Sequence, residues 1–162
     1  MSANGKRTVS GNEKKHDSYA LAHVMIRNSL EKTCPLQAIA IEESILSDRL
    51  WSALHYRPVD RKLKYEKLSD AIRVWEDEEG KGSCAIVLDG RSMFTRQDIA
   101  QWNERRNKLI HGIVKYRPNG NHISAAKFVA SAMKAAKDGL ELVRQVENWS
   151  KRAKRRAESK RG

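Results

Sequence analysis

Apolar residues recur at helical spacing through most of the chain. Within residues 17–32, Tyr19, Ala22, Ile26 and Leu30 follow one another every three or four positions, which is the period of one helix face. The same pattern predicts four more helices, over residues 36–56, 62–79, 96–116 and from about 122 to 150 or beyond. The predicted fold is therefore all-α, a single bundle of four to five helices with short connections.

The helix predicted over residues 36–56 has two apolar strips, about 120° apart around its axis. One strip consists of Ala38, Ile41 and Ile45, and the other of Ile39, Leu46, Leu50 and Leu54. A helix that is apolar on two sides packs between neighbours, so we expect it at the centre of the bundle. Glu42 lies between the strips. Glu43 falls within the second strip, where a carboxylate needs a cationic partner or a water-lined pocket.

Residues 83–94, with the sequence SCAIVLDGRSMF, interrupt the helical pattern. Their short apolar run cannot make a sheet alone. We therefore expect either a packed loop or a short strand that pairs elsewhere. Directly after this segment, Thr95 and Asp98 have the spacing of a capping box at the start of the next helix.

Positive charge is concentrated at the end of the sequence. The 162 residues include 32 Lys and Arg against 20 Asp and Glu, for a formal net charge of +12. Residues 151–162 contribute half of this excess. Such a segment either attracts nucleic acid through its charge, whatever the nucleotide sequence, or remains a solvated end of the chain. We predict three parts: a flexible arm over residues 1–15, the helical bundle over 16–150, and a basic tail over 151–162 that contacts RNA or DNA.

Composition and cysteine usage indicate a cytoplasmic protein without a metal or other cofactor. Cys34 and Cys84 form no CxxC pair, which fits a reducing compartment. The five histidines and two cysteines never fall into zinc-ligand spacing. No apolar run approaches the ~20 residues that span a bilayer, and the first fifteen residues lack the apolar core of a signal peptide. We therefore expect no membrane contact.

Candidate catalytic and phosphate-binding residues are concentrated on the helix predicted over residues 96–116. Histidine transfers protons near neutral pH, and arginine binds phosphate through a fork of donors. These roles suit His111 and Arg106, while Asn107, one helical turn before His111, can orient the imidazole or contact phosphate. The set fits attack of an RNA 2′-hydroxyl on the neighbouring phosphate, without a metal. Three further cations are interpreted as RNA-phosphate contacts or solvated charges: Arg105, Lys108 and Lys115.

Residues 106–112, Arg-Asn-Lys-Leu-Ile-His-Gly, resemble the signature of the HEPN superfamily, in which an arginine, usually followed by a polar residue, precedes a histidine by four to six positions. The motif covers seven residues, and the helical architecture agrees loosely over most of the chain. The resemblance implies a homodimeric, metal-independent endoribonuclease that acts as a toxin, in anti-phage defence or in RNA processing. It also implies an antitoxin or regulatory protein as a partner. One subfamily carries a modified Tyr two residues after the histidine; Ile113 stands there, which argues against that mode of silencing.

The geometry of a helix places the two principal candidate residues on different sides of its axis. Five residues turn a helix by about 500°, which leaves Arg106 and His111 about 140° apart. They can border one groove only if the length of arginine bridges the gap or if a second subunit supplies the other half. A two-fold axis presents each motif to its copy, so we expect a homodimer through this helix.

Two other interpretations remain open. In the structural interpretation, His111 is hydrogen-bonded to Asn107, and Arg106 is ion-paired with Glu42 or Glu43, because ion-pair networks also resemble sites. In an active site, the same carboxylates would orient Arg106. In the other interpretation, the chain is a non-catalytic HEPN-like module that binds nucleic acid or a partner protein, or a regulatory subunit of an enzyme on another chain.

Overall fold

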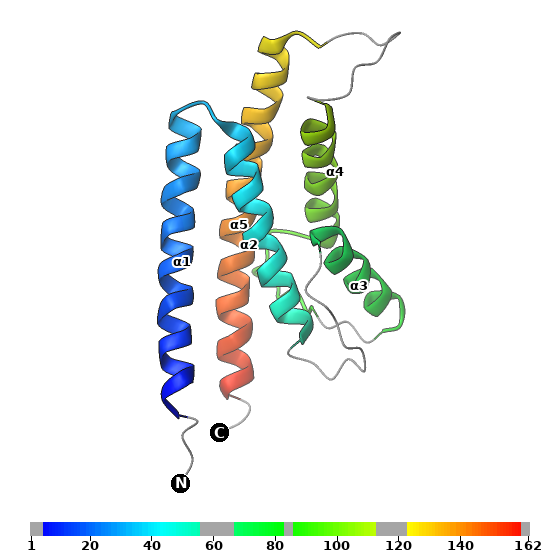
Figure 1. Cartoon of the computed structure of the whole chain (residues 1–162). Coiled ribbons are helices and arrows are strands. Elements are labelled where there is room, and N and C mark those ends of the chain that lie inside the picture. The colour runs from blue at the N-terminus through cyan, green and yellow to red at the C-terminus, as the bar shows by residue number, and fades with distance from the viewer. Residues whose placement is uncertain (1–4, 56–66, 83–85, 113–122, 160–162) are drawn as a thin grey trace.

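The computed structural model consists of five helices and, among the residues that it describes, no strand (Figure 1). It describes residues 5–55, 67–82, 86–112 and 123–159. The helices are α1 (Gly5–Glu31), α2 (Pro35–His55), α3 (Leu68–Gly80), α4 (Arg96–Gly112) and α5 (Ala125–Ser159). The prediction of an all-α bundle of four to five helices is confirmed. None of the described helices combines the length and the apolar character needed to cross a bilayer.

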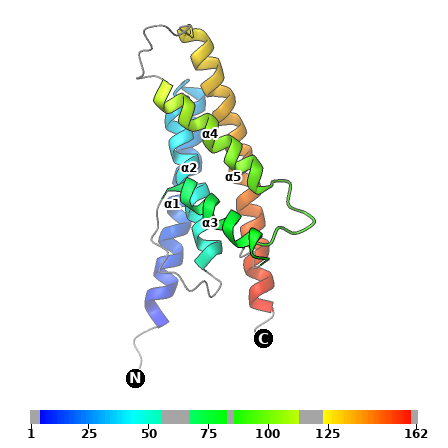
Figure 2. The same ribbon diagram turned by 90° about the vertical axis from the view of Figure 1, so that its right-hand side faces the viewer.

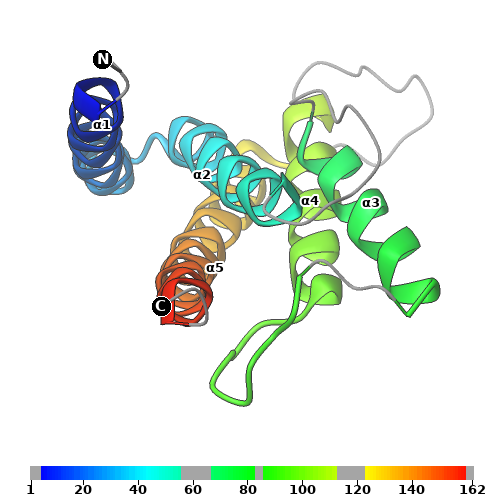
Figure 3. The ribbon, with the colours of Figure 1, turned by 90° about the horizontal axis from the view of Figure 1, so that it is seen from below.

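Helix α2 lies at the centre and contacts all four other helices. Viewed from below, it lies between α1 on one side and α3 and α4 on the other, with α5 alongside (Figure 3). Both of its apolar strips are used, because six of their seven residues are buried: Ala38, Ile39, Ile45, Leu46, Leu50 and Leu54. The central position that the double strip predicted is therefore confirmed.

Helix α1 begins at Gly5, so residues 5–15 are helical where the sequence predicted a flexible arm. No proline interrupts this stretch, and Lys15 forms an ion pair of 2.9 Å with Asp48 on α2. After α1 ends, Thr33 adopts a left-handed conformation with a φ of 54°. Pro35 then opens α2, in the first-turn position that its fixed φ suits.

The segment between α3 and α4 is a packed loop over residues 86–95, the first of the two alternatives for this region; residues 83–85 lie outside the described part. Phe94 is buried and meets the Trp149 ring edge-to-face, with 5.9 Å between the centroids. The Trp149 indole N–H donates to the Val87 carbonyl at 3.1 Å. These contacts attach the loop to α5, which gives its apolar residues a core position without a sheet.

The capping box that opens α4 is present as predicted. The backbone N–H of Thr95 donates to the Asp98 carboxylate at 2.7 Å, and the backbone N–H of Asp98 donates to the Thr95 hydroxyl at 3.2 Å. Each side chain thus satisfies a donor that the first helical turn leaves without a partner. The two residues of this box therefore fix where α4 begins, and α4 is the helix that carries residues 106–112.

Helix α5 continues to Ser159, so most of the predicted basic tail is helical; residues 160–162 lie outside the described part. Ala, Lys, Arg and Glu dominate this stretch, and all four are strong helix formers. Two of its arginines, Arg152 and Arg156, bind Asp89 of the packed loop. The end of the bundle is therefore longer and better anchored than the charge pattern indicated.

Candidate functional site

Helix α4 lies beside the first part of α5 (Figure 2). The two helices border an open groove of about 1110 Å³. It lies where the C-terminal half of α4 faces the N-terminal half of α5. Apolar residues line part of it: Leu109, Ile123, Ala125, Phe128, Val129 and Ala135. Polar residues line the rest: Glu104, Arg105, Asn107, Lys108, His111, Ser131 and Lys134. A groove of this composition offers an apolar surface for a base and cations for phosphate.

His111 and Asn107 lie one helical turn apart on α4, and both line this groove. The His111 side chain is exposed in the last turn of the helix, and Asn107 is half-buried. Among the described residues, no hydrogen bond joins the two; the side-chain amide oxygen of Asn107 instead accepts a bond of 2.6 Å from the Arg106 guanidinium. The structural interpretation of His111 as a partner of Asn107 therefore finds no contact in the described part of the chain.

Arg106 points away from the groove, toward the central helix. Its guanidinium forms an ion pair with Glu43 on α2, and the two side chains are only 19% and 20% exposed. Among the described residues, the lining of the groove includes His111 but not Arg106. The two principal candidates thus lie on different sides of α4, as the 140° separation predicted. The ion pair with Glu43 fits both the structural and the orienting interpretation.

Glu42 is the carboxylate that does not contact Arg106. Its side chain is fully buried, and neither carboxyl oxygen has a hydrogen-bond partner within the described structure. Burial raises the pKa of the Glu42 carboxyl to about 8, so the group is mostly protonated at neutral pH. Of the two carboxylates that the sequence left open, Glu43 is the one that contacts Arg106.

Two of the three predicted phosphate contacts lie at the groove and are already paired. Arg105 binds Asp138 at 2.8 Å, and Lys108 binds Glu104 at 2.7 Å. These are exposed ion pairs of the kind that contribute little stability and exchange readily with other anions. Lys115, the third predicted contact, lies outside the described residues.

Lys134 of α5 is a groove residue that sequence reasoning missed. It lines the same groove as His111, is 74% exposed, and lies 3.7 Å from Asp138. The sequence does contain a signal, because Lys134, Lys137 and Arg144 recur at helical spacing. That spacing identifies an outer helix face, but not which groove the face meets.

The chain matches no protein-family model, no curated protein and no solved structure. The HEPN resemblance therefore stands on residues 106–112 and on the helical architecture. Among the described residues, no three His, Cys, Asp or Glu side chains cluster as metal ligands would.

Proposed function

We propose that this chain is a metal-independent endoribonuclease whose active site is the groove between α4 and α5. One observation carries the proposal: an exposed histidine, His111, borders a groove whose rim holds Arg105, Lys108 and Lys134. A proton-transfer group beside several phosphate-binding cations is what RNA cleavage requires. The resemblance of residues 106–112 to the HEPN signature supports the same assignment.

In the proposed reaction, the RNA 2′-oxygen attacks the adjacent phosphorus. The new P–O2′ bond forms as the P–O5′ bond breaks, which leaves a 2′,3′-cyclic phosphate and a 5′-hydroxyl. His111 accepts the 2′-hydroxyl proton as general base or protonates the leaving 5′-oxygen as general acid. Asn107, which lines the same groove, orients the reacting groups beside His111. The groove cations offset the negative charge that develops on the phosphoryl oxygens.

The resemblance implies a second copy of the chain, with two motifs meeting at one substrate. In each copy Arg106 faces α2 and pairs with its own Glu43, so one subunit does not present it beside His111. The outer face of α4 is polar and exposed at Glu104, Arg105 and Lys108. A two-fold axis on this face would bring the His111 side chains of two copies to one substrate. We therefore propose a homodimer through α4.

The biological setting follows from the resemblance alone. It is that of a cytoplasmic effector, a toxin or an anti-phage nuclease, controlled by an antitoxin or a regulatory protein.

The test is cleavage of mixed RNA in the presence of EDTA by wild type, His111→Ala and Arg106→Ala. His16→Ala is the matched control, because it removes an exposed histidine on α1. Wild type and the control should cut and leave cyclic phosphate ends, while His111→Ala should cut at least about 100-fold more slowly. Equal cutting by wild type and His111→Ala, with both variants folded, would refute the assignment.

A non-catalytic, RNA-binding module is the second candidate. It is favoured by the contacts of Arg106, whose guanidinium is engaged by both Glu43 and Asn107 within the fold. For such a module, neither wild type nor His111→Ala would cut, and both would bind RNA with the same affinity. The same cleavage experiment, followed by a binding titration, separates the two candidates.

A further inference from the structure

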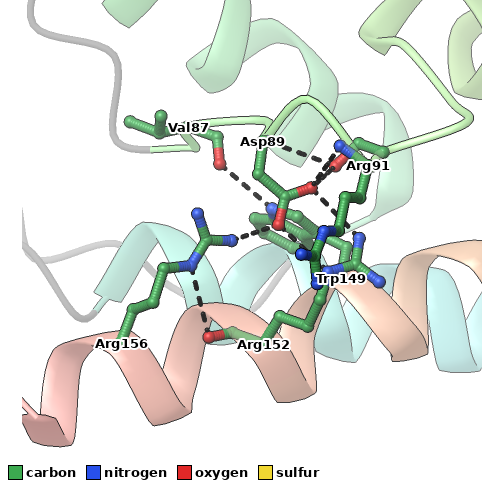
Figure 4. Close-up of polar contacts among 7 residues, drawn as sticks. Val87, Asp89, Arg91, Trp149, Arg152 and Arg156 are labelled. Atoms are coloured by element: carbon green, nitrogen blue, oxygen red, sulfur yellow. Dashed lines mark hydrogen bonds and ion pairs between the residues drawn. The ribbon is translucent and has the colours of Figure 1, made fainter.

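Two groups of basic residues on α5 have different surroundings. Arg152 and Arg156 turn toward the packed loop, where both bind the carboxylate of Asp89 (Figure 4). Arg152 makes two of these contacts, at 3.0 and 3.1 Å. The hydrogen bonds from Arg152 and Ser92 lower the pKa of Asp89, so this carboxylate stays charged. These two arginines are engaged in holding the loop.

The second group forms a row of cations on the side of α5 opposite the core. At 100° per residue, its members fall within an arc of about 100°, and all five are exposed: Lys134, Lys137, Arg144, Lys151 and Arg155. The face extends for about 32 Å along the helix, at 1.5 Å per residue. Glu141 is the acidic residue within this arc and lies 3.8 Å from Arg144. We call these five residues the α5 cationic face.

One end of this face enters the groove. Lys134 belongs to the face and also lines the groove that His111 borders. A chain of phosphates bound along the face would therefore lead directly to the proposed site of cleavage. We propose that the α5 cationic face binds the backbone of an RNA strand and guides it into the groove, an inference that rests on the proposed nuclease function.

The composition of the face favours nucleic acid over a membrane surface. Helices that lie on membranes present large apolar residues beside their basic ones. No exposed large apolar residue lies on α5 between Lys134 and Arg155. A linear row of cations instead matches a linear polyanion, whose binding is driven by release of its condensed counterions.

The test compares two variants of the full chain with the same loss of charge. The face variant combines Lys137→Gln, Arg144→Gln, Lys151→Gln and Arg155→Gln. The matched control replaces four exposed cations away from the face with Gln: Arg27, Lys32, Arg73 and Lys81. Both variants carry His111→Ala, so that the probe, a fluorescently labelled 20-nucleotide RNA, is not cut. Lys134 is retained because it lines the groove.

Fluorescence anisotropy over a series of salt concentrations gives the dissociation constant and its salt dependence. The face variant should bind at least about tenfold more weakly near 0.1 M salt, and its log–log salt slope should fall by up to about 3, at roughly 0.7 per lost phosphate contact. The control should stay within about threefold of the parent. An unchanged face variant, or a control that loses as much affinity, overturns the proposal.

Two further measurements separate this surface from its rivals. If the face variant loses binding to vesicles that contain phosphatidylserine but keeps its RNA affinity, the face is a membrane surface and the proposal fails.

In an otherwise wild-type chain that cuts RNA, the face variant should lower kcat/KM and leave kcat at saturating RNA unchanged. RNA bound through the face but never cut would refute the nuclease and leave the surface standing. Cutting with unchanged kcat/KM would refute the surface alone.

Discussion

Arg106 on α4 is ion-paired with Glu43 on α2, and the same guanidinium donates a hydrogen bond of 2.6 Å to Asn107. One side chain thus connects the central helix of the bundle to an amide on the groove wall. Because both members of the ion pair are about four-fifths buried, solvent screens the interaction less than at the surface. Glu43 is therefore in a position to control where Arg106 and Asn107 lie.

Replacing Glu43 with Gln should slow RNA cleavage by about tenfold or more, because Arg106 loses the charge that holds it. The free energy of unfolding should fall by about 1–3 kcal/mol, since Gln still accepts a hydrogen bond but leaves the largely buried Arg106 charge unpaired. A double-mutant cycle provides the decisive measurement. If Glu43 acts through Arg106, Arg106→Ala should cause little further loss of cleavage in the Glu43→Gln background.

Glu104→Gln is the control for this prediction, because it breaks the exposed ion pair with Lys108. It should change cleavage and stability only slightly. Additive effects of the Glu43 and Arg106 substitutions on cleavage would show that Glu43 does not position Arg106.

Gly139 is required where α5 crosses α4 and α2. A Cβ atom at this position would lie 2.2 Å from the Glu42 carboxyl and 2.7 Å from the Trp102 indole nitrogen. The Glu42 side chain has some freedom to move, but the indole is rigid, buried, and bonded to the Ala135 carbonyl at 2.9 Å. Gly139→Ala should therefore lower the free energy of unfolding by about 1–3 kcal/mol, as measured by urea denaturation.

Gly80→Ala is the matched control for this prediction, because nothing lies within 4 Å of a Cβ atom placed there. At the end of α3 it should be neutral or slightly stabilising, as alanine is the better helix former. A Gly139→Ala variant as stable as wild type would show that α5 can shift away from Trp102 on α4 with no loss in the free energy of unfolding.

The buried carboxyl of Glu42 should make stability depend on pH. Its pKa is about 8 in the folded chain and 4.5 as an isolated group, so the folded state favours the protonated form. This contribution is fully present below pH 4.5 and is lost as the pH rises toward 8, at about 1.4 kcal/mol per pH unit at most. Wild type should therefore lose stability across this window.

Glu42→Gln keeps the shape of the carboxyl and removes the titration. Its unfolding free energy, measured by urea denaturation from pH 5 to 9, should vary less with pH than that of wild type. Near pH 8 the variant should be the more stable of the two. Parallel pH profiles for the two proteins would show that Glu42 is ionised in the fold.

Replacing Asp89 with Asn should increase RNA affinity. The substitution removes the carboxylate that engages Arg152 and Arg156, and it frees two guanidinium groups next to the α5 cationic face. With up to two more phosphate contacts available, affinity should rise at least about threefold near 0.1 M salt. Asp77→Asn, which removes one exposed carboxylate from α3, is the control for net charge. An Asp89→Asn variant that binds no better than this control would contradict the prediction.

Much of the fold follows from the sequence because its signals are local. The double strip on residues 36–56 predicts the central helix, and the spacing of Thr95 and Asp98 sets the start of α4. The 140° between Arg106 and His111 follows from helix geometry alone. The helix over residues 5–15 was missed, because its polar composition indicated a flexible arm. The continuation of the last helix beyond residue 150 was left open by the sequence, and the structure extends it to Ser159.

The sequence by itself determined the helices, their apolar faces and the residues that carry candidate chemistry, because periodicity is a property of neighbouring residues. Only the tertiary structure decided which partners these residues meet. Glu42 and Glu43 are adjacent, yet one is buried beside Gly139 and the other binds Arg106, because about 100° of helix rotation directs them at different neighbours. In the same way, Lys134 reaches the groove of His111 only because α5 packs beside α4. Such pairings join segments far apart in sequence, and no local pattern encodes them.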